Sequence, residues 1–154
     1  MFQVRYILIL CLLIASIFCN FSFAQIVKTQ EEKRAEYILI NMQQDYITCY
    51  IFYKIGAEAV RRSGGETDIV NGIEKSSDNS LKFAFETGEI MNMSAEVMST
   101  KVKKEMKSQS DEMKNDYNNT PALVSKYGLM CKNLIQDKKQ RIDFWEKKAL
   151  NKFK

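Results

Sequence analysis

Cysteine is the residue type of this chain whose chemistry is easiest to constrain. There are four cysteines, and two of them fall in the first 24 residues. The others, Cys49 and Cys131, each have a tyrosine one helical turn away, Tyr53 after the first and Tyr127 before the second. Two cysteines of an exported domain usually pair, so we predict a structural disulfide between them. A redox site is the alternative, but the chain has no C-x-x-C motif to support it.

Histidine is absent from all 154 residues. It is the commonest general base and metal ligand, so Ser-His-Asp and Cys-His centres are excluded. Only Cys49 and Cys131 would remain once an N-terminal export signal is removed, and two cysteines are too few for a typical four-ligand zinc site. We expect no metal and no cofactor.

Carboxylates and methionines offer weaker possibilities. Glu31, Glu32, Glu36 and Asp45 are expected on an exposed helix surface, where a catalytic pair would lack the burial that separates two pKa values. An enzyme that uses carboxylates alone therefore stays open only as an alternative. Methionine thioethers bind Cu(I) in some exported proteins, but core packing explains the spacing of these methionines better. The three at core spacing are Met98, Met106 and Met113.

The last seventeen residues combine positive charge with aromatic side chains. Seven Lys or Arg oppose only Asp143 and Glu146. Such a segment can lie on an anionic membrane or bind nucleic acid. The candidate partner or membrane surface consists of Arg141, Phe144, Trp145, Lys147 and Lys148.

The positive and apolar residues of this segment are not cleanly separated on a helix. Lys148 and Lys152 fall on the same side as Trp145. We therefore prefer a docked helix that buries Trp145 and Ile142 while its lysines stay in water. Nucleic acid is not expected as a partner of an exported protein.

The first 24 residues have the pattern of an export signal. Arg5 precedes an almost unbroken apolar run over 6–18, and Ser22-Phe23-Ala24 places small residues where a signal peptidase reads them. The run is short for a membrane span, which needs about 20 residues. We expect a signal peptide over 1–24 and a mature chain over 25–154, periplasmic or secreted. An uncleaved membrane anchor is the alternative.

Periodic apolar residues position these groups on helices. One proline and six glycines are too few turn residues for a many-stranded β protein. Steps of three and four between apolar residues indicate helices. We expect them over 30–63, 68–91 and 94–117, then from Thr120-Pro121, and over 138–151.

Several helix boundaries carry their own signals. Gly64-Gly65 should end the first helix, and Ser94, Thr120 and Asp137 should cap later ones. Two alternatives remain open: a break in the serine-rich stretch 76–80, and one continuous helix over 79–117. The fold class is all-α: residues 25–154 form a single domain, a compact four- to five-helix bundle with one disulfide.

Several short motifs along the chain are shared with a group of known proteins that the chain resembles. They are Cys49-x-x-x-Tyr53, Met93-Ser94 at a helix start, Tyr127-x-x-x-Cys131 and Arg141-x-x-x-Trp145. In these features the chain is similar to small uncharacterised exported helical proteins, with one cysteine pair, of Gram-negative bacteria and their phages. The resemblance implies a helical fold and no particular activity.

The function expected from the sequence is that of an exported interaction module without catalytic activity. Its partner would be another envelope or secreted protein, bound through a helix face. The first alternative is a peripheral membrane or lipid-binding protein acting through residues 138–154. The oligomeric state is left open.

Overall fold

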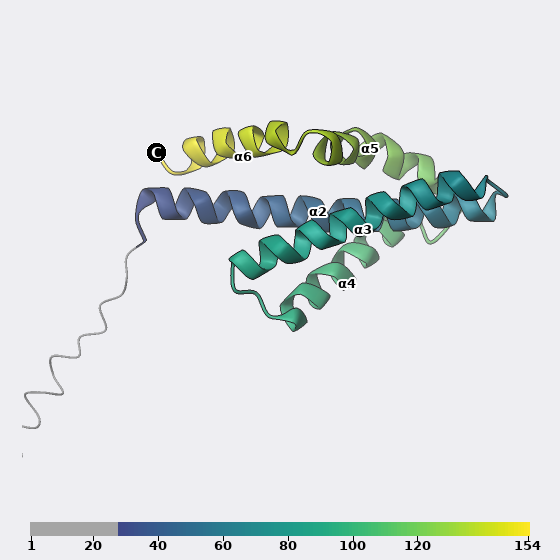
Figure 1. The fold of residues 1–154 in the computed structure, drawn as a ribbon, viewed down its shortest axis with the longest axis horizontal. Helices are drawn as coiled ribbons and strands as arrows, with labels where there is room; N and C mark the ends of the chain where they lie inside the picture. Colours follow the sequence, from purple (N-terminus) through teal and green to yellow (C-terminus); the bar gives the residue numbers. More distant parts are fainter. Residues whose placement is uncertain (1–27) are drawn as a thin grey trace, which may run out of the picture.

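The computed structural model describes residues 28–154 and contains α-helices joined by short turns (Figure 1). No strand occurs within this range, so the all-α prediction is confirmed. The predicted signal peptide lies outside the described residues. The elements are α2 (Gln30–Arg62), α3 (Thr67–Ile90), α4 (Ala95–Glu112), the short 3-10 helix η1 (Tyr117–Asn119), α5 (Thr120–Gln136) and α6 (Lys138–Lys152).

The long helix α2 is the spine of the bundle. It begins with a capping box, in which Thr29 Oγ1 accepts from the Glu32 backbone N–H and the Glu32 carboxylate accepts from that of Thr29. It ends before Gly64, which has the left-handed φ of 75° that glycine adopts without strain. Figure 1 shows α3 running back along α2, with α5 and α6 along another side. Neighbours on several sides explain why residues 45–49 are buried without interruption.

Helix α3 is continuous through its serine-rich stretch. Ser77 and Ser80 are fully buried. The Ser77 hydroxyl donates to the Tyr50 carbonyl of α2 over 3.1 Å, and the Ser80 hydroxyl donates to the Ser76 carbonyl over 2.9 Å. A buried hydroxyl with a partner is inexpensive, and small side chains let two helices approach closely. The serines therefore mark a helix contact and not a helix break.

The turn between α3 and α4 separates two helices, so a single helix over 79–117 is wrong. Asn92 has a φ of 54°, and Ser94 then caps α4 by accepting from the Val97 backbone N–H. Helix α4 ends at Glu112, earlier than expected. Lys114 and Asn115 follow with φ values of 54° and 56°, a conformation that a helix cannot continue through.

The start of α5 corrects one predicted cap. Thr120 is the first residue of the helix rather than its N-cap, and its hydroxyl donates to the Tyr117 carbonyl of η1. Pro121 follows in the first turn as expected. Asp137 caps α6 as predicted, because its carboxylate accepts from the Lys139 backbone N–H.

The disulfide predicted from the sequence joins Cys49 of α2 to Cys131 of α5, and both residues are fully buried. The two helices meet in the core beside Ile47, Ile51 and Leu134. The buried stripe of α5 runs through Leu123 and not through Val124, which is exposed.

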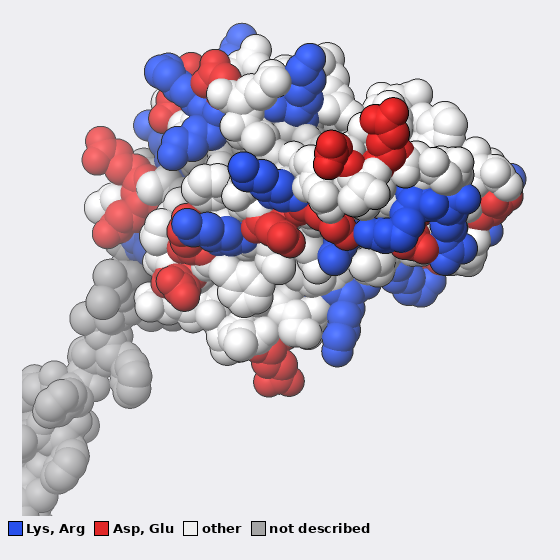
Figure 2. Space-filling model, turned by 45° about the vertical axis from the view of Figure 1, so that its right-hand side comes forward, with Lys and Arg blue, Asp and Glu red and all other residues white. Residues whose placement is uncertain are grey.

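The outer surface is strongly charged and mixed in sign. Figure 2 shows basic and acidic side chains interspersed on one face. Many of the exposed ion pairs join residues one helical turn apart, as between Lys107 and Asp111. Among residues 28–154, no helix is long and apolar enough to cross a membrane.

Candidate functional site

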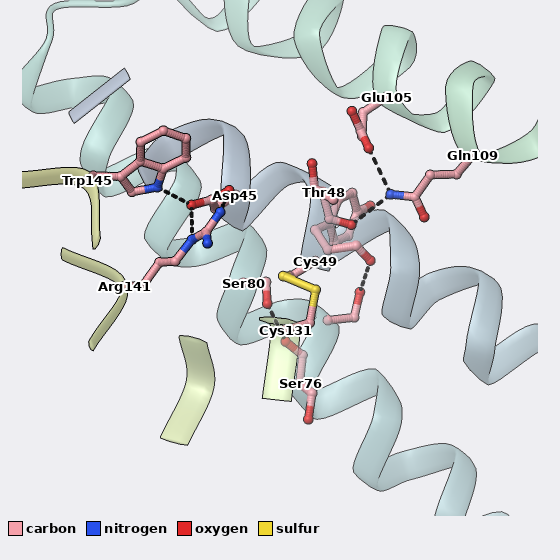
Figure 3. The surroundings of a disulfide bond; sticks show 12 residues. Asp45, Thr48, Cys49, Ser76, Ser80, Glu105, Gln109, Cys131, Arg141 and Trp145 are labelled. Carbon is pink, nitrogen blue, oxygen red and sulfur yellow. Dashed lines mark hydrogen bonds and ion pairs between the residues drawn. A yellow bond between two sulfur atoms is a disulfide. The ribbon is translucent and has the colours of Figure 1, made fainter. Parts of the chain in front are cut away.

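Asp45 fixes the C-terminal helix to α2. The Arg141 guanidinium binds it with two hydrogen bonds, Nε to Oδ2 at 2.7 Å and Nη2 to Oδ1 at 2.9 Å. The Trp145 indole N–H donates to Oδ2 at 2.5 Å. Figure 3 shows the three side chains converging beside the disulfide. A bidentate Arg–carboxylate pair is both strong and directional, so α6 has a defined position and rotation on α2.

The expectation that Asp45 lies on an exposed surface is wrong. Its residue is only 7% exposed, because α6 covers this side of α2. Asp45 is also the one carboxylate in the buried class within residues 28–154. Both of its oxygens already accept hydrogen bonds from Arg141 and Trp145. This arrangement suits a structural anchor, because three donors hold the carboxylate in place and α6 covers it.

The structure divides the five predicted surface residues into two groups. Arg141 and Trp145 point inward to Asp45. Phe144, Lys147 and Lys148 are exposed, with Phe144 41% exposed. The prediction that Trp145 docks is confirmed, because it packs against the core together with Ile142.

A groove of about 450 Å³ lies where α5 meets α6. Its apolar walls come from Leu129 and Met130 of α5 and Phe144 of α6. Leu129 is 73% exposed, the highest exposure among the large apolar side chains of the described range. The remaining lining residues are polar: Ser125, Lys126, Asn133, Gln140 and Arg141. We call these eight residues the elbow groove.

The elbow groove lies in the most positive part of the described chain. Residues 120–154 contain nine Lys or Arg against three Asp or Glu, whereas residues 28–119 contain thirteen against sixteen. The Phe144 ring has the Arg141 Cζ at 4.5 Å and the Lys148 Nζ at 5.6 Å from its centroid. Such cations are attracted by the ring quadrupole. The aromatic wall of the groove therefore lies in a positive environment.

Glu112, at the end of α4, binds Lys126, one of the residues that line the elbow groove. Its Oε1 accepts from the Lys126 ammonium at 2.6 Å and from the Tyr127 hydroxyl at 2.9 Å. Burial acts to raise the pKa of Glu112, but these two hydrogen bonds outweigh it and the pKa lies below its ordinary value. The same contact raises the pKa of Lys126. The positive charge of Lys126 is thus balanced by Glu112 within the protein.

A second cavity, of about 270 Å³, lies between α2 and α4. Lys101 lines it, and its ammonium donates to the Gln43 side-chain oxygen at 2.6 Å. Burial lowers the pKa of Lys101. Glu105 also lines this cavity, and its carboxylate accepts from the amides of Gln44 and Gln109. The wall of this cavity thus carries both a cation, Lys101, and an anion, Glu105. These opposite charges do not favour a ligand of either sign.

The methionines have different environments. Met98 and Met113 are buried as expected, whereas Met106 is exposed, contrary to its spacing. The Met98 and Met93 sulfurs both accept from the Gln43 side-chain amide, at 2.7 Å and 3.2 Å. An amide therefore occupies the point where the two thioethers converge.

Comparison of the chain with protein-family models, with curated proteins and with solved structures finds no match. The candidate site therefore rests on the geometry above. The sequence pointed to the C-terminal helix but missed Leu129, which lies off the apolar stripe of α5. A large apolar residue that lies off the apolar stripe of a helix is expected to be exposed, and this position of Leu129 in the sequence could have indicated the groove.

Proposed function

We propose that this protein is an exported helical interaction module, which binds another envelope or secreted protein through the elbow groove. The observation that carries the proposal is the groove itself, because Leu129 and Phe144 expose apolar surface in a concave site. Concave sites of this size with a few polar groups are the usual places for ligands. Exposed apolar surface beside polar residues is also typical of protein contacts.

Two features support export. A fully buried disulfide is typical of proteins that fold in an oxidising compartment. The first 24 residues also have the charge, apolar run and small residues of a secretion signal.

Peripheral membrane binding is the second candidate function. Phe144 and the exposed lysines beside it favour it. Trp145 does not support it, because its indole N–H is bound to Asp45 in the interface between α6 and α2. The aromatic residue best suited to a membrane interface is therefore already used by the fold.

Crosslinking within the native envelope tests the proposal. A photoreactive amino acid at Lys132, beside the elbow groove, should capture one exported protein. The same group at the exposed Lys75 of α3 is the control and should not capture that protein. The capture at position 132 should disappear in a chain that also carries Leu129→Asp. If positions 132 and 75 give the same products, the groove is not the binding site.

A further inference from the structure

We infer that the elbow groove takes an acidic segment of the partner, with one large apolar side chain inserted between Leu129 and Phe144. This inference rests on the proposed function and adds the chemistry of the partner. It is carried by two independent features, the apolar walls of the groove and the positive charges along its rim that have no counterion in the described chain.

The shape of the groove limits what can enter it. A volume of about 450 Å³ accommodates one or two large side chains and not a whole helix, whose diameter is about 10 Å. Leu129 stands at one wall and Phe144 at the other, and Met130 also lines the groove. Methionine adapts its shape to different contacts. The groove therefore fits an anchoring side chain such as Phe or Leu.

The charges inside the groove are already balanced. Lys126 pairs with Glu112, and Arg141 pairs with Asp45. Breaking the Arg141–Asp45 pair would leave a largely buried charge without a partner, which is unfavourable. The Lys126–Glu112 pair is more exposed, but the Lys126 ammonium already donates to Glu112 at 2.6 Å. These two residues therefore contribute shape and aliphatic surface, and they are not the charges that attract the partner.

The charges along the rim are different. Lys132 lies three residues after Leu129, while Lys147 and Lys148 lie three and four residues after Phe144. This spacing places each of them beside a groove wall, one helical turn away. All three are exposed, and none has a carboxylate within 4.0 Å among residues 28–154. Asp or Glu residues on either side of the anchor would complement them.

Two other occupants are weaker candidates. A second copy of this chain could present residues 28–119, but their excess of acidic over basic residues is small, sixteen against thirteen. An anionic membrane would meet the lysines but could not place a single side chain in a concave groove. Both are tested as competing outcomes below.

Fluorescence anisotropy with the full exported chain tests the inference. The probe is a short labelled peptide in which one Phe is flanked by Glu residues, and the comparison peptides carry Ala for Phe or Lys for Glu. Only the first peptide should bind measurably, and added salt should weaken it because the rim charges are exposed. Leu129→Asp should weaken binding about tenfold or more, as expected for a central contact.

The matched control is Val124→Asp. Val124 is also an exposed aliphatic residue of α5, 53% exposed, but it does not line the groove. This variant should bind the peptide as the wild type does. Lys132→Glu should weaken binding and reduce its dependence on salt. Unchanged thermal unfolding would show that each variant is folded.

Several outcomes would overturn the inference. They are no binding of the Phe–Glu peptide, equal binding of the Lys peptide, or equal losses in Leu129→Asp and Val124→Asp. Sedimentation of the chain with phosphatidylglycerol vesicles, lost in Leu129→Asp, would assign the groove to a membrane. A dimer that Leu129→Asp dissociates would assign it to a second copy. Capture of a partner at position 132 without a preference for the acidic peptide would refute the inference alone, whereas no capture would refute the proposed function.

Discussion

Asp45 connects parts of the chain that are far apart in sequence, since Arg141 lies 96 residues and Trp145 lies 100 residues after it. The Asp45 and Arg141 side chains are 10% and 22% exposed. An ion pair this deep owes its effect mainly to the cost of breaking it. Loss of either partner leaves a charge that water can solvate only in part.

We expect Asp45→Asn to destabilise the fold by about 3 kcal/mol, because Arg141 would lose its counterion in a largely buried position. Urea unfolding followed by Trp145 fluorescence measures this directly. Asp143→Asn is the matched control: Asp143 is exposed and, among residues 28–154, its one ion pair is with Lys139 one turn away, so its loss should cost less than about 1 kcal/mol. Equal effects of the two substitutions would show that Asp45 does not anchor α6.

Glu112 should give the protein part of its sensitivity to acid. Its pKa is lowered in the folded chain, so the unfolded chain binds the proton more readily. The stability from this group is therefore complete above the ordinary glutamate pKa of 4.5 and is lost as the pH falls through the lower, folded value. Glu112→Gln should reduce the slope of stability against pH in that acidic range. Urea unfolding at a series of pH values tests it, with the exposed Glu89→Gln as control, which should leave the slope unchanged.

The partner of a polar residue cannot be predicted from the pattern of a single helix. The spacing of Trp145 and Ile142 predicts that they pack against the core, where both are partly buried, and the number of cysteines predicts the disulfide. The sequence places Asp45 on the surface, because a helical pattern distinguishes only apolar from polar positions. Its burial depends on Arg141, which a second helix brings to it, and nothing local to either residue indicates that contact.

At the level of helices, the contact between α2 and α4 is unusually polar. Gln109 is fully buried, and its amide donates to the Thr48 carbonyl and to Glu105, while its side-chain oxygen has no partner within the described chain. Figure 3 shows this contact. Met98 is the one fully buried apolar side chain within α4, Val102 is partly buried against the core, and the C-cap Met113 is buried just beyond the helix. The packing around Met98 therefore has a large influence on how α4 is held.

Gly88 tests that packing. A Cβ at this position would lie 2.8 Å from Gln43 Nε2 and 2.9 Å from Met98 Sδ. We expect Gly88→Ala to destabilise the protein by about 1–3 kcal/mol, since both neighbours are buried and must move. Gly72→Ala in the same helix is the control: its Cβ would meet nothing within 4 Å. It should stabilise the protein by about 0.5–1 kcal/mol through helix propensity. The melting temperatures of the two variants test this prediction. A Gly88→Ala protein that melts above the wild type would refute the close contact.

The sequence predicts the caps of α4 and α6 correctly but misplaces Thr120 at the start of α5 and extends α4 too far. Ser94 and Asp137 act within one turn, so a local sequence is enough to identify them. The end of α4 depends on two consecutive non-glycine residues with positive φ, Lys114 and Asn115. Lysine gives no indication of that conformation. Similarly, the buried face of α5 is set by its contact with α2, which selects Leu123 over Val124.

For the whole molecule, the disulfide joins α5 to α2 and the Asp45 anchor joins α6 to α2. Cys49 and Cys131 are 82 residues apart, and α3 and α4 lie within the loop that they close. Helix α6 follows Cys131, so the disulfide does not constrain it directly. Its attachment to α2 rests on noncovalent contacts: the Asp45 anchor, the Arg34 hydrogen bond to the Phe153 carbonyl, and the Tyr37 ring against Trp145 and Phe153. The α5 wall of the elbow groove is therefore held to α2 by the disulfide, whereas the α6 wall is held by noncovalent contacts.

Removal of the disulfide should destabilise the whole bundle. A closed loop of this length is worth roughly 4 kcal/mol in the entropic treatment, and native strain can reduce that value. We expect Cys49→Ser or Cys131→Ser to lower the melting temperature, because each substitution also buries a hydroxyl in an apolar site. The double variant Cys49→Ala with Cys131→Ala separates the loss of the bond from the cost of a buried polar group, and it should be more stable than either serine variant. Peptide mapping of the exported protein without reductant should join the Cys49 and Cys131 peptides, whereas free thiols at both positions would refute the pairing.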